Sequence, residues 1–254
     1  MVFVASFFLL YMSSSSLASV VIDIVGESMC PDTTHFFMTQ LMPVYRKYRS
    51  DIKINYHPFG PTAYTFCSMG RNGMRCSCQH GPEECTKNAL QACLLQFYPD
   101  NALETVACVQ GNSDFQEAYS ECIEGKFSRN DSDRLFKCAT TSIGFTLVAA
   151  HGATIAREIS DDISWVPWIS IKGQRIIEAE TNLEEVLCKK VSPSICRMKI
   201  SQKMIPADLP DTNWTETDLI TKSKPHQIQN EGAGSYRRIE SLSIRALLFW
   251  IRSW

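Results

Sequence analysis

The sequence predicts an α/β fold that opens with a β-α-β unit. Residues 20–26, VVIDIVG, form a short β-branched apolar run that is typical of a buried strand. Helix-compatible sequence follows, and residues 51–60, DIKINYHPFG, alternate Ile and Tyr with other residues before a Pro/Gly turn. Because strands joined through a helix usually run parallel, this opening indicates a parallel sheet.

The segment between these strands is expected to be a helix that begins after Cys30. Pro31 suits the first helical turn, where a missing backbone N–H is tolerated, and apolar residues then recur at helical spacing. Pro43 should kink or shorten this helix, because proline removes a backbone donor from the helix interior.

The sheet is expected to close late in the chain. Residues 166–172 and 175–179 are predicted strands joined by a turn at Lys172-Gly173, and a helix should run from about 183 to 190. A hairpin followed by a helix would complete a small sheet.

Between these parts, residues 66–138 are predicted to form a helical insertion cross-linked by disulfides. Eight of the eleven cysteines fall there, among segments with helical periodicity. Residues 137–159 are predicted to form a further long helix, broken near Gly152.

Composition supports one domain over residues 20–200. The chain has 254 residues, 44% of them hydrophobic, and a net charge of −2. Near-neutral charge gives no electrostatic reason to expect a nucleic acid or an anionic membrane as partner.

Both ends have the composition of segments outside the domain. Residues 1–19 are predicted to be a signal peptide, with an apolar run too short to span a bilayer and a small-residue cleavage site. Residues 201–254 are polar for most of their length and are predicted to be a flexible tail without a transmembrane segment. In the secretory pathway, the sequons at Asn130 and Asn213 would become glycosylation sites.

Cys30 is the candidate reactive residue. It stands between a predicted strand and a predicted helix, where the positive end of the helix dipole stabilises a negative charge. Eleven cysteines cannot all pair within a monomer, and position favours Cys30 as the free one. The other ten are predicted to form disulfides: Cys67, Cys76, Cys78, Cys85, Cys93, Cys108, Cys122, Cys138, Cys188 and Cys196.

Pro167 is the second candidate. It follows Val166 at the start of a predicted strand, where thioredoxin folds place a cis-proline beside the active cysteine. A trans proline that starts a strand is the alternative. Together with the Cys-Pro junction upstream, the position favours the cis isomer.

His80 and the cysteines around it raise the question of a zinc site. Cys78, Cys85 and Cys93 lack the close paired spacing of common structural zinc sites. A disulfide framework is the better interpretation in a secreted chain, so no metal is expected.

The same segment, CQHGPEECTKNALQAC (78–93), resembles the signature CQHG-x2-EC-x2-N-x4-C of the gamma-interferon-inducible lysosomal thiol reductase family. The resemblance continues through INYHPFG, AAHG and VPWISIKG, and so covers roughly residues 20–196. It implies a thioredoxin-like domain with a helical insertion, secreted or lysosomal, that reduces protein disulfides at acid pH. It also implies glycosylated precursors that are trimmed at both ends.

The chain departs from this family at its active site. The family pattern is C-x-x-C, whereas this chain reads Cys30-Pro31-Asp32-Thr33. The resemblance assigns the nucleophile to Cys30 and leaves the resolving cysteine without a counterpart. Thr33 cannot attack a sulfur, but its hydroxyl could donate a hydrogen bond to the Cys30 thiolate, whereas Asp32 would oppose a negative charge there.

Two functions follow from these observations. The first is a reductase with one catalytic sulfur, in which a small thiol such as cysteine or glutathione releases the disulfide-containing protein substrate, without another cofactor. The second is a secreted, disulfide-rich binding protein that kept the fold and lost turnover. His35 and His57 are weaker candidates, because most histidines are packed or solvated.

Overall fold

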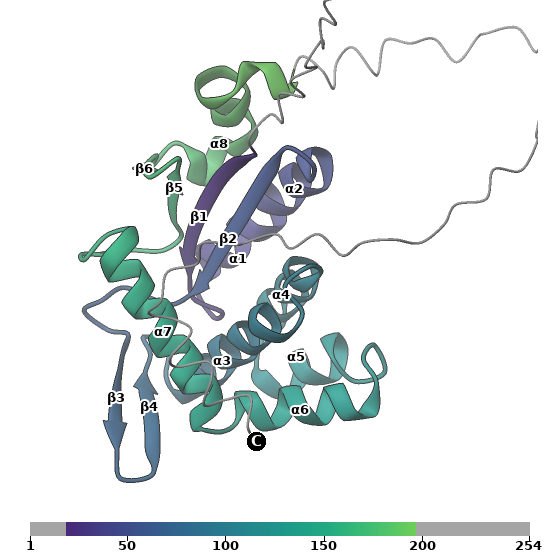
Figure 1. Cartoon of the computed structure of the whole chain (residues 1–254), viewed down its shortest axis with the longest axis vertical. Helices are drawn as coiled ribbons and strands as arrows, with labels where there is room; N and C mark the ends of the chain where they lie inside the picture. Colours follow the sequence, from purple (N-terminus) through teal and green to yellow (C-terminus); the bar gives the residue numbers. More distant parts are fainter. Residues whose placement is uncertain (1–18, 197–254) are drawn as a thin grey trace, which may run out of the picture. The chain divides into compact units, whose positions relative to one another are not determined.

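The computed structural model describes residues 19–196, whose course Figure 1 shows. The chain divides into two units, Met1–Ile205 and Pro206–Trp254, and all described residues belong to the first. Residues 1–18 of the predicted signal peptide and the whole predicted tail therefore lie outside the described residues.

The chain opens with the predicted β-α-β unit. Strands β1 (Val20–Gly26) and β2 (Ile52–Pro58) pair in parallel. Helical backbone runs between them without a break, and Pro43 lies in its third part, directly after a π-helical turn. The irregularity expected at this proline is thus a wider helical turn, and the helix continues. The three parts are α1 (Pro31–Phe36), η1 (Phe37–Leu41) and α2 (Met42–Tyr48).

The described sheet has four strands in the order β2-β1-β5-β6. β5 (Trp168–Ile171) lies antiparallel to β1, and β6 (Gln174–Arg175) lies antiparallel to β5. Lys172 and Gly173 form the turn between them with φ values of 52° and 76°. The turn stands where the sequence predicts it, and its left-handed backbone explains the glycine.

The end of the sheet differs from the prediction. The second strand of the hairpin, predicted over 175–179, ends at Arg175. The next residue still donates its N–H to Ile169 O at 3.0 Å, after which the chain turns into α8 (Ala179–Glu185) and η2 (Val186–Val191). The closing helix therefore starts earlier than predicted.

The β-α-β unit, the antiparallel hairpin and the closing helix together form a thioredoxin-like fold, as the sequence predicts. The first helix is held against the sheet by two aromatic side chains that are almost fully buried, Phe36 and Phe37. The Phe37 ring meets the Tyr56 ring of β2 edge to face, with centroids 4.9 Å apart. This contact fixes the helix whose first residue follows Cys30.

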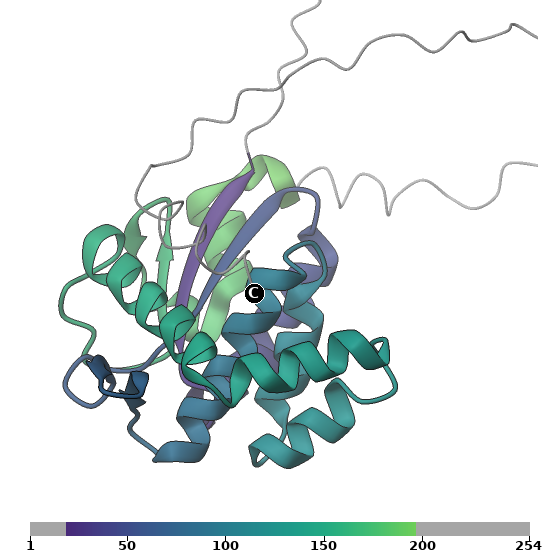
Figure 2. The same ribbon diagram turned by 60° about the horizontal axis from the view of Figure 1, so that its bottom comes forward.

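The insertion between β2 and β5 is mainly helical. Figures 1 and 2 show α3 to α6 gathered beside the β-α-β unit. A β-hairpin precedes these helices. The sequence does not predict it, because its two strands are short and mostly exposed and have no alternating pattern of buried residues. The elements are β3 (Phe66–Gly70), β4 (Gly73–Ser77), α3 (Pro82–Phe97), α4 (Ala102–Gly111), α5 (Phe115–Cys122), α6 (Arg129–Ala139) and α7 (Ser142–Glu158).

The long helix predicted over 137–159 is instead two helices separated at Thr140 and Thr141, well before the break expected at Gly152. α7 begins after Thr141, whose hydroxyl accepts the Ile143 N–H at 3.4 Å. Gly152 lies inside α7, and a Cβ there would come within 2.7 Å of the Phe59 ring. The glycine therefore serves packing and does not break the helix.

Among residues 19–196, no single helix is both long enough and apolar enough to cross a membrane. The helices α6 and α7 reach that length and apolar composition only when they are taken together, and the two are bent by 67° relative to each other.

Candidate active site

Cys30 lies between β1 and α1 and caps the helix. Its backbone is extended, with φ −71° and ψ 122°, and its carbonyl accepts the Thr34 N–H at 3.0 Å. The residue is 8% exposed. Among residues 19–196 it is the only cysteine outside a disulfide. The structure therefore places one thiol at the start of the helix, where the N–H groups of the first turn favour a negative charge.

Pro167 lies opposite this thiol. The Val166-Pro167 peptide bond is cis, the isomer expected from the sequence, and it directly precedes β5. Because β5 is the neighbour of β1, this bond lies near the end of the strand that leads to Cys30. The Cys30 Sγ lies 3.7 Å from Val166 O. Two segments 136 residues apart thus meet at the sulfur.

Thr33 occupies a closed space against the end of β1. Its side chain is fully buried, and a Cβ added to Gly26 would lie 2.6 Å from Thr33 Cγ2. The Thr33 hydroxyl has no hydrogen-bond partner among the described residues. The bond from this hydroxyl to Cys30, which the sequence allowed, is thus absent from the structure.

The other ten cysteines form five disulfides. One closes the β3-β4 hairpin, one lies inside the signature segment, two join helices of the insertion, and one closes the last helical segment. Because Cys78, Cys85 and Cys93 are all bridged, none is a free thiolate ligand for a metal beside His80. The pairs are Cys67–Cys76, Cys78–Cys85, Cys93–Cys138, Cys108–Cys122 and Cys188–Cys196.

Helix α3 holds the loop that carries the thiol. Ser28 donates its N–H to Asn88 Oδ1 at 2.9 Å and its hydroxyl to Glu84 O at 3.2 Å. The buried Lys87 Nζ donates to Ser28 O at 3.0 Å and also to Asn112 O. Burial lowers the pKa of Lys87 to about 8. Glu84 and Asn88 belong to the signature segment, so this segment positions the loop before Cys30.

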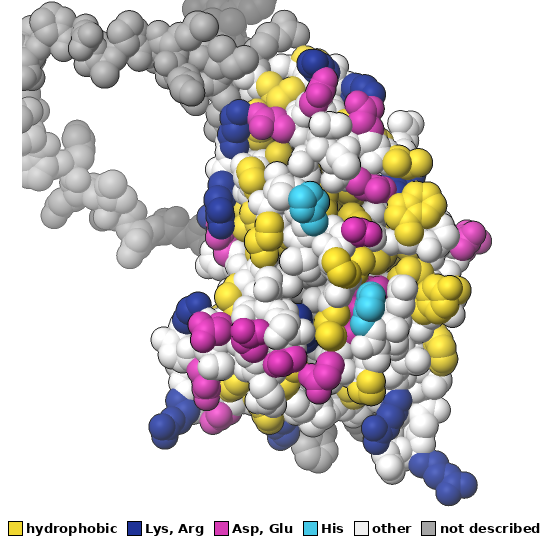
Figure 3. Space-filling view, turned by 180° about the vertical axis from the view of Figure 1, so that it is seen from behind, with side chains coloured by type: hydrophobic (Ala, Val, Ile, Leu, Met, Phe, Trp, Pro, Cys, Tyr) yellow, Lys and Arg dark blue, Asp and Glu magenta, His cyan; other side chains and the backbone are white. Residues whose placement is uncertain are grey.

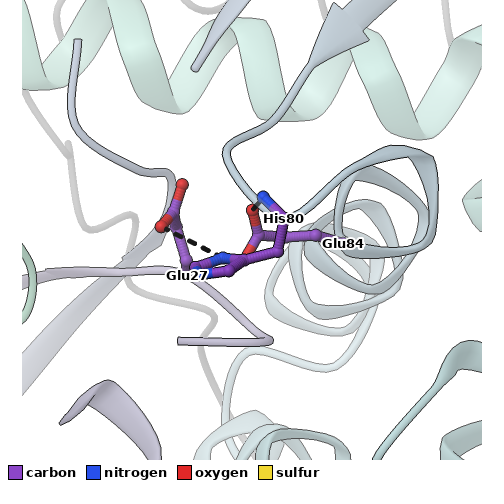
Figure 4. Close-up of side chains that lie close together, drawn as sticks. All are labelled: Glu27, His80 and Glu84. Atoms are coloured by element: carbon purple, nitrogen blue, oxygen red, sulfur yellow. Dashed lines mark hydrogen bonds and ion pairs between the residues drawn. The ribbon is translucent and has the colours of Figure 1, made fainter. Parts of the chain in front are cut away.

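Glu27, His80 and Glu84 converge beside this loop, as Figure 4 shows. His80 Nδ1 lies 2.7 Å from Glu84 Oε1 and 3.8 Å from Glu27 Oε2. The outer oxygens are held by other donors: Thr65 donates to Glu27 Oε1 at 2.7 Å, and the His80 N–H donates to Glu84 Oε2 at 2.9 Å. Both carboxylates are fully buried.

The same three side chains are the described group that could hold a divalent cation. One ligand atom from each lies within 4.8 Å of the others. Glu27 could not be identified from the sequence, because a single glutamate after a strand carries no motif. The available signal was its position three residues before Cys30.

An open groove of about 550 Å³ lies next to the loop that carries Cys30, although Cys30 itself does not line it. One wall comes from the loop around Cys30 and from α1, including Met29 and Pro31. The other comes from the end of α4 and the turn after it, including Gln110 and Asn112. Figure 3 shows a face of the molecule on which hydrophobic side chains and two histidines lie among acidic groups.

Comparisons with known proteins agree with this geometry. The family model for gamma interferon inducible lysosomal thiol reductase matches residues 21–126. A GILT-like protein of Caenorhabditis elegans is 32% identical over 182 residues, which cover 69% of this chain and 83% of that protein. The chain belongs to the gamma-interferon-inducible lysosomal thiol reductase family.

Other relatives carry the family name directly. The gamma-interferon-inducible lysosomal thiol reductase of Carassius auratus is 25% identical, with 72% of this chain and 74% of that protein covered. Among solved structures, MdbA, a thiol-disulfide oxidoreductase from Corynebacterium diphtheriae, matches with a TM-score of 0.39 and 14% identity, covering 68% of this chain and 85% of that one. Family membership supports a thiol reductase.

Within this family member, the remaining candidates lie on β2, α1 and α6. His57 of β2 pairs with His151 of α7, with their Nδ1 atoms 3.1 Å apart. His35 and Asp32 are exposed on α1, where Asp32 lies in the first turn. Asn130 is exposed on α6, as a glycan would require. The second sequon, at Asn213, lies outside the described residues.

Proposed function

We propose that this chain is a protein-disulfide reductase that works at acid pH through the single sulfur of Cys30. The observation that carries the proposal is the thiol of Cys30: it is free, it belongs to the residue at the N-cap position of α1, and it lies 3.7 Å from Val166 O before the cis-proline. The sulfur therefore lies between the first turn of α1 and the main-chain carbonyl of Val166.

The first step is attack on a substrate disulfide. The Cys30 thiolate forms a bond to one substrate sulfur, the disulfide bond breaks, and the other substrate sulfur leaves as a thiolate that takes a proton. The groove lined by Met29 and Pro31, the two neighbours of Cys30 in the chain, offers space for part of the substrate chain near that disulfide. No other free thiol is present among residues 19–196, so the mixed disulfide has no internal nucleophile.

Release therefore needs a thiol from outside. An external thiolate attacks Cys30 Sγ, which frees the second substrate sulfur and leaves the small thiol bonded to Cys30. A second external thiol then restores the Cys30 thiolate and leaves as the oxidised small disulfide. Two small thiols are oxidised for each protein disulfide reduced, and no bound cofactor enters the cycle.

The test is insulin reduction at about pH 5 with cysteine or glutathione supplied. The wild type should reduce insulin at a rate that rises with the concentration of the small thiol. The variant Cys30→Ser should fall to the rate of the small thiol alone, because it has no sulfur for the first step. Equal rates for the wild type and Cys30→Ser would favour a binding protein that kept the fold without turnover.

A second variant tests the missing resolving thiol. Thr33→Cys should raise the rate at limiting external thiol by about tenfold or more, because an intramolecular thiol attacks at a high effective concentration. The enclosed site at position 33 suits the change, since Cys is no larger than Thr. The control is Thr34→Cys, one residue further along α1. An equal gain in both variants would show that the position of the thiol does not matter.

The location proposed for this protein is the secretory pathway, with delivery outside the cell or to lysosomes. The five disulfides support an oxidising compartment during folding. The exposed Asn130 supports modification there. Treatment of the expressed protein with an N-glycosidase, followed by comparison of Asn130→Gln and Asn213→Gln, would show which site carries a glycan.

A further inference from the structure

Glu27, His80 and Glu84 bring three metal-binding side chains to one point from two separate parts of the chain. Glu27 follows β1, whereas His80 precedes α3 and Glu84 lies in its first turn. One ligand atom of each lies within 4.8 Å of the others, and Figure 4 shows the imidazole beside both carboxyl groups. Imidazole and carboxylate ligands lie about 2.0 to 2.2 Å from zinc. Small side-chain movements would therefore bring all three atoms onto a shared ion.

The carboxyl group of Glu27 has one oxygen without a partner. The side chain is fully buried, and its Oε2 has no hydrogen-bond partner among the described residues. This oxygen lies 3.8 Å from His80 Nδ1, which is longer than a hydrogen bond. Buried polar atoms are nearly always paired, so an unpaired one calls for a further ligand such as an ion. A cation between Glu27 Oε2 and His80 Nδ1 would fill this need.

The outer oxygens of the two carboxyl groups are held by donors. Thr65 donates its hydroxyl to Glu27 Oε1 at 2.7 Å, and the backbone N–H of His80 donates to Glu84 Oε2 at 2.9 Å. Gly60 packs so closely against Glu27 that a Cβ at position 60 would overlap the carboxyl group. The remaining oxygens, Glu27 Oε2 and Glu84 Oε1, are the two that approach His80 Nδ1. Outer hydrogen bonds of this kind orient the ligands of metal sites.

The charges around the cluster and its access to solvent also suit a cation. Among residues 19–196, no lysine or arginine forms an ion pair with Glu27 or Glu84. The ammonium group of the nearby Lys87 donates to two backbone carbonyls instead. Both carboxyl groups are fully buried, whereas the side chain of His80 is 34% exposed. The imidazole side therefore gives an ion access from solvent.

We propose that Glu27, His80 and Glu84 form a binding site for one divalent transition-metal ion, and that zinc is the ion best suited to it. An imidazole ligand favours zinc and its transition-metal neighbours over calcium and magnesium, which prefer oxygen ligands alone. Three protein ligands leave the fourth tetrahedral position to a water molecule. The ion takes the place of the hydrogen between His80 Nδ1 and Glu84 Oε1, which lie 2.7 Å apart, and this proton is released to solvent.

The ion would brace the loop that carries Cys30. Glu27 O accepts the Cys30 N–H at 3.3 Å and the Gln110 Nε2–H at 2.9 Å, so a fixed Glu27 side chain also fixes this backbone. The ion would join the loop to the signature segment, to which Ser28 already donates two hydrogen bonds. It takes no part in thiol exchange. The site therefore does not depend on the proposed reductase activity.

The test is zinc binding to the full chain after bound metal has been removed with a chelator. Titration calorimetry is done at about pH 7, because protons compete with the ion in acid. His80→Ala should weaken binding by about a hundredfold or more, since it removes a ligand, and the partial exposure of His80 lets the fold tolerate the change. Thr65→Val should weaken binding by about tenfold to a hundredfold, because it removes only the donor that orients Glu27.

Two controls separate this site from other zinc ligands. His35→Ala removes an exposed histidine of α1, and Cys30→Ser removes the free thiol, so both should bind zinc as the wild type does. Cobalt(II) reports the ligand atoms directly. With nitrogen and oxygen ligands it should give weak visible bands without the intense near-ultraviolet band of a sulfur ligand.

Thermal unfolding gives a measurement that is independent of the calorimetry. The midpoint of the wild type should rise with zinc concentration, whereas that of His80→Ala should not, and a cooperative transition shows that each variant is folded. Three results would overturn the proposal. They are the absence of zinc binding, binding that is unchanged in both His80→Ala and Thr65→Val, and a cobalt–sulfur band that disappears in Cys30→Ser.

Discussion

At the scale of single residues, two adjacent threonines of α1 differ in what their hydroxyls do. The Thr33 hydroxyl is buried without a hydrogen-bond partner among the described residues. The Thr34 hydroxyl donates to Cys30 O at 3.1 Å and accepts from Gln110 Nε2 at 3.0 Å. Thr34 thus ties the first turn of the helix to the insertion, whereas Thr33 only fills space.

Replacement by valine, which has the same shape, should therefore have opposite effects at these two positions. Thr33→Val should stabilise the fold by about 1 kcal/mol, because it removes an unpaired buried hydroxyl. Thr34→Val should destabilise it by about 1 to 2 kcal/mol, because it leaves one of the two N–H groups of the Gln110 amide without its acceptor. Urea unfolding at one pH measures both, and a loss of stability in Thr33→Val would mean that the Thr33 hydroxyl has a partner.

The sequence could identify Cys30 and Pro167 because each stands at a junction between predicted elements. It could not identify Glu27, since the importance of this residue comes from meeting His80 and Glu84, which follow it by more than fifty positions. Contacts of this kind depend on the packing of α3 against the loop. Periodicity along the chain does not report them.

At the scale of elements, the sheet is predictable from local sequence, whereas much of the insertion depends on contacts between distant residues. The parallel strands and the Lys172-Gly173 turn have local signals, and the structure has both. The β3-β4 hairpin has none, and the glycine expected to break a helix is used for packing against Phe59. Local sequence reports backbone preference, whereas Gly152 is required by a neighbour distant in the chain.

The disulfides between helices should contribute according to the chain that they close. Cys93–Cys138 spans 45 residues and joins α3 to α6, whereas Cys188–Cys196 spans 8. Loss of loop-closure entropy in the unfolded chain predicts a cost of about 4 kcal/mol for removal of the first and about 2.5 kcal/mol for the second.

The comparison uses two double variants, Cys93→Ala with Cys138→Ala and Cys188→Ala with Cys196→Ala. Neither adds a free thiol beside Cys30. The first pair should lose more stability in urea unfolding, and cavity formation at the buried α3 site adds to the difference. Equal losses would show that the constraint on the unfolded chain is not the dominant contribution.

At the scale of the whole molecule, two buried groups set opposite dependences of stability on pH. The pKa of Glu27 is raised to about 7 in the fold, so its contribution is complete below the unfolded value of 4.5 and is lost as pH rises through about 7. The pKa of His151 is lowered to about 3 by burial and then by His57. Its contribution is complete above the unfolded value of 6.5 and is lost as pH falls toward about 3.

Between pH 7 and pH 5 the two contributions therefore have opposite signs in the metal-free chain, and the gain at Glu27 is the larger. Acidification over this range should gain about 2 kcal/mol from Glu27 and lose about 1 kcal/mol at His151, where solvent reaches part of the residue and reduces the effect. The stability gained at Glu27 therefore compensates for the stability lost at His151 as the pH falls from 7 to 5.

Substitution of either group should change how stability depends on pH, in a direction that follows from its pKa. Glu27→Gln removes the gain, so its stability should fall on acidification from about pH 7 to 5, because His151 still resists protonation. His151→Gln keeps a polar partner for His57 and removes the loss, so its stability should rise over the same range. Thermal midpoints at the two pH values measure the tilt, with the exposed His35→Gln as the control that should follow the wild type. Parallel profiles in all four proteins would mean that neither buried group changes its proton affinity on folding.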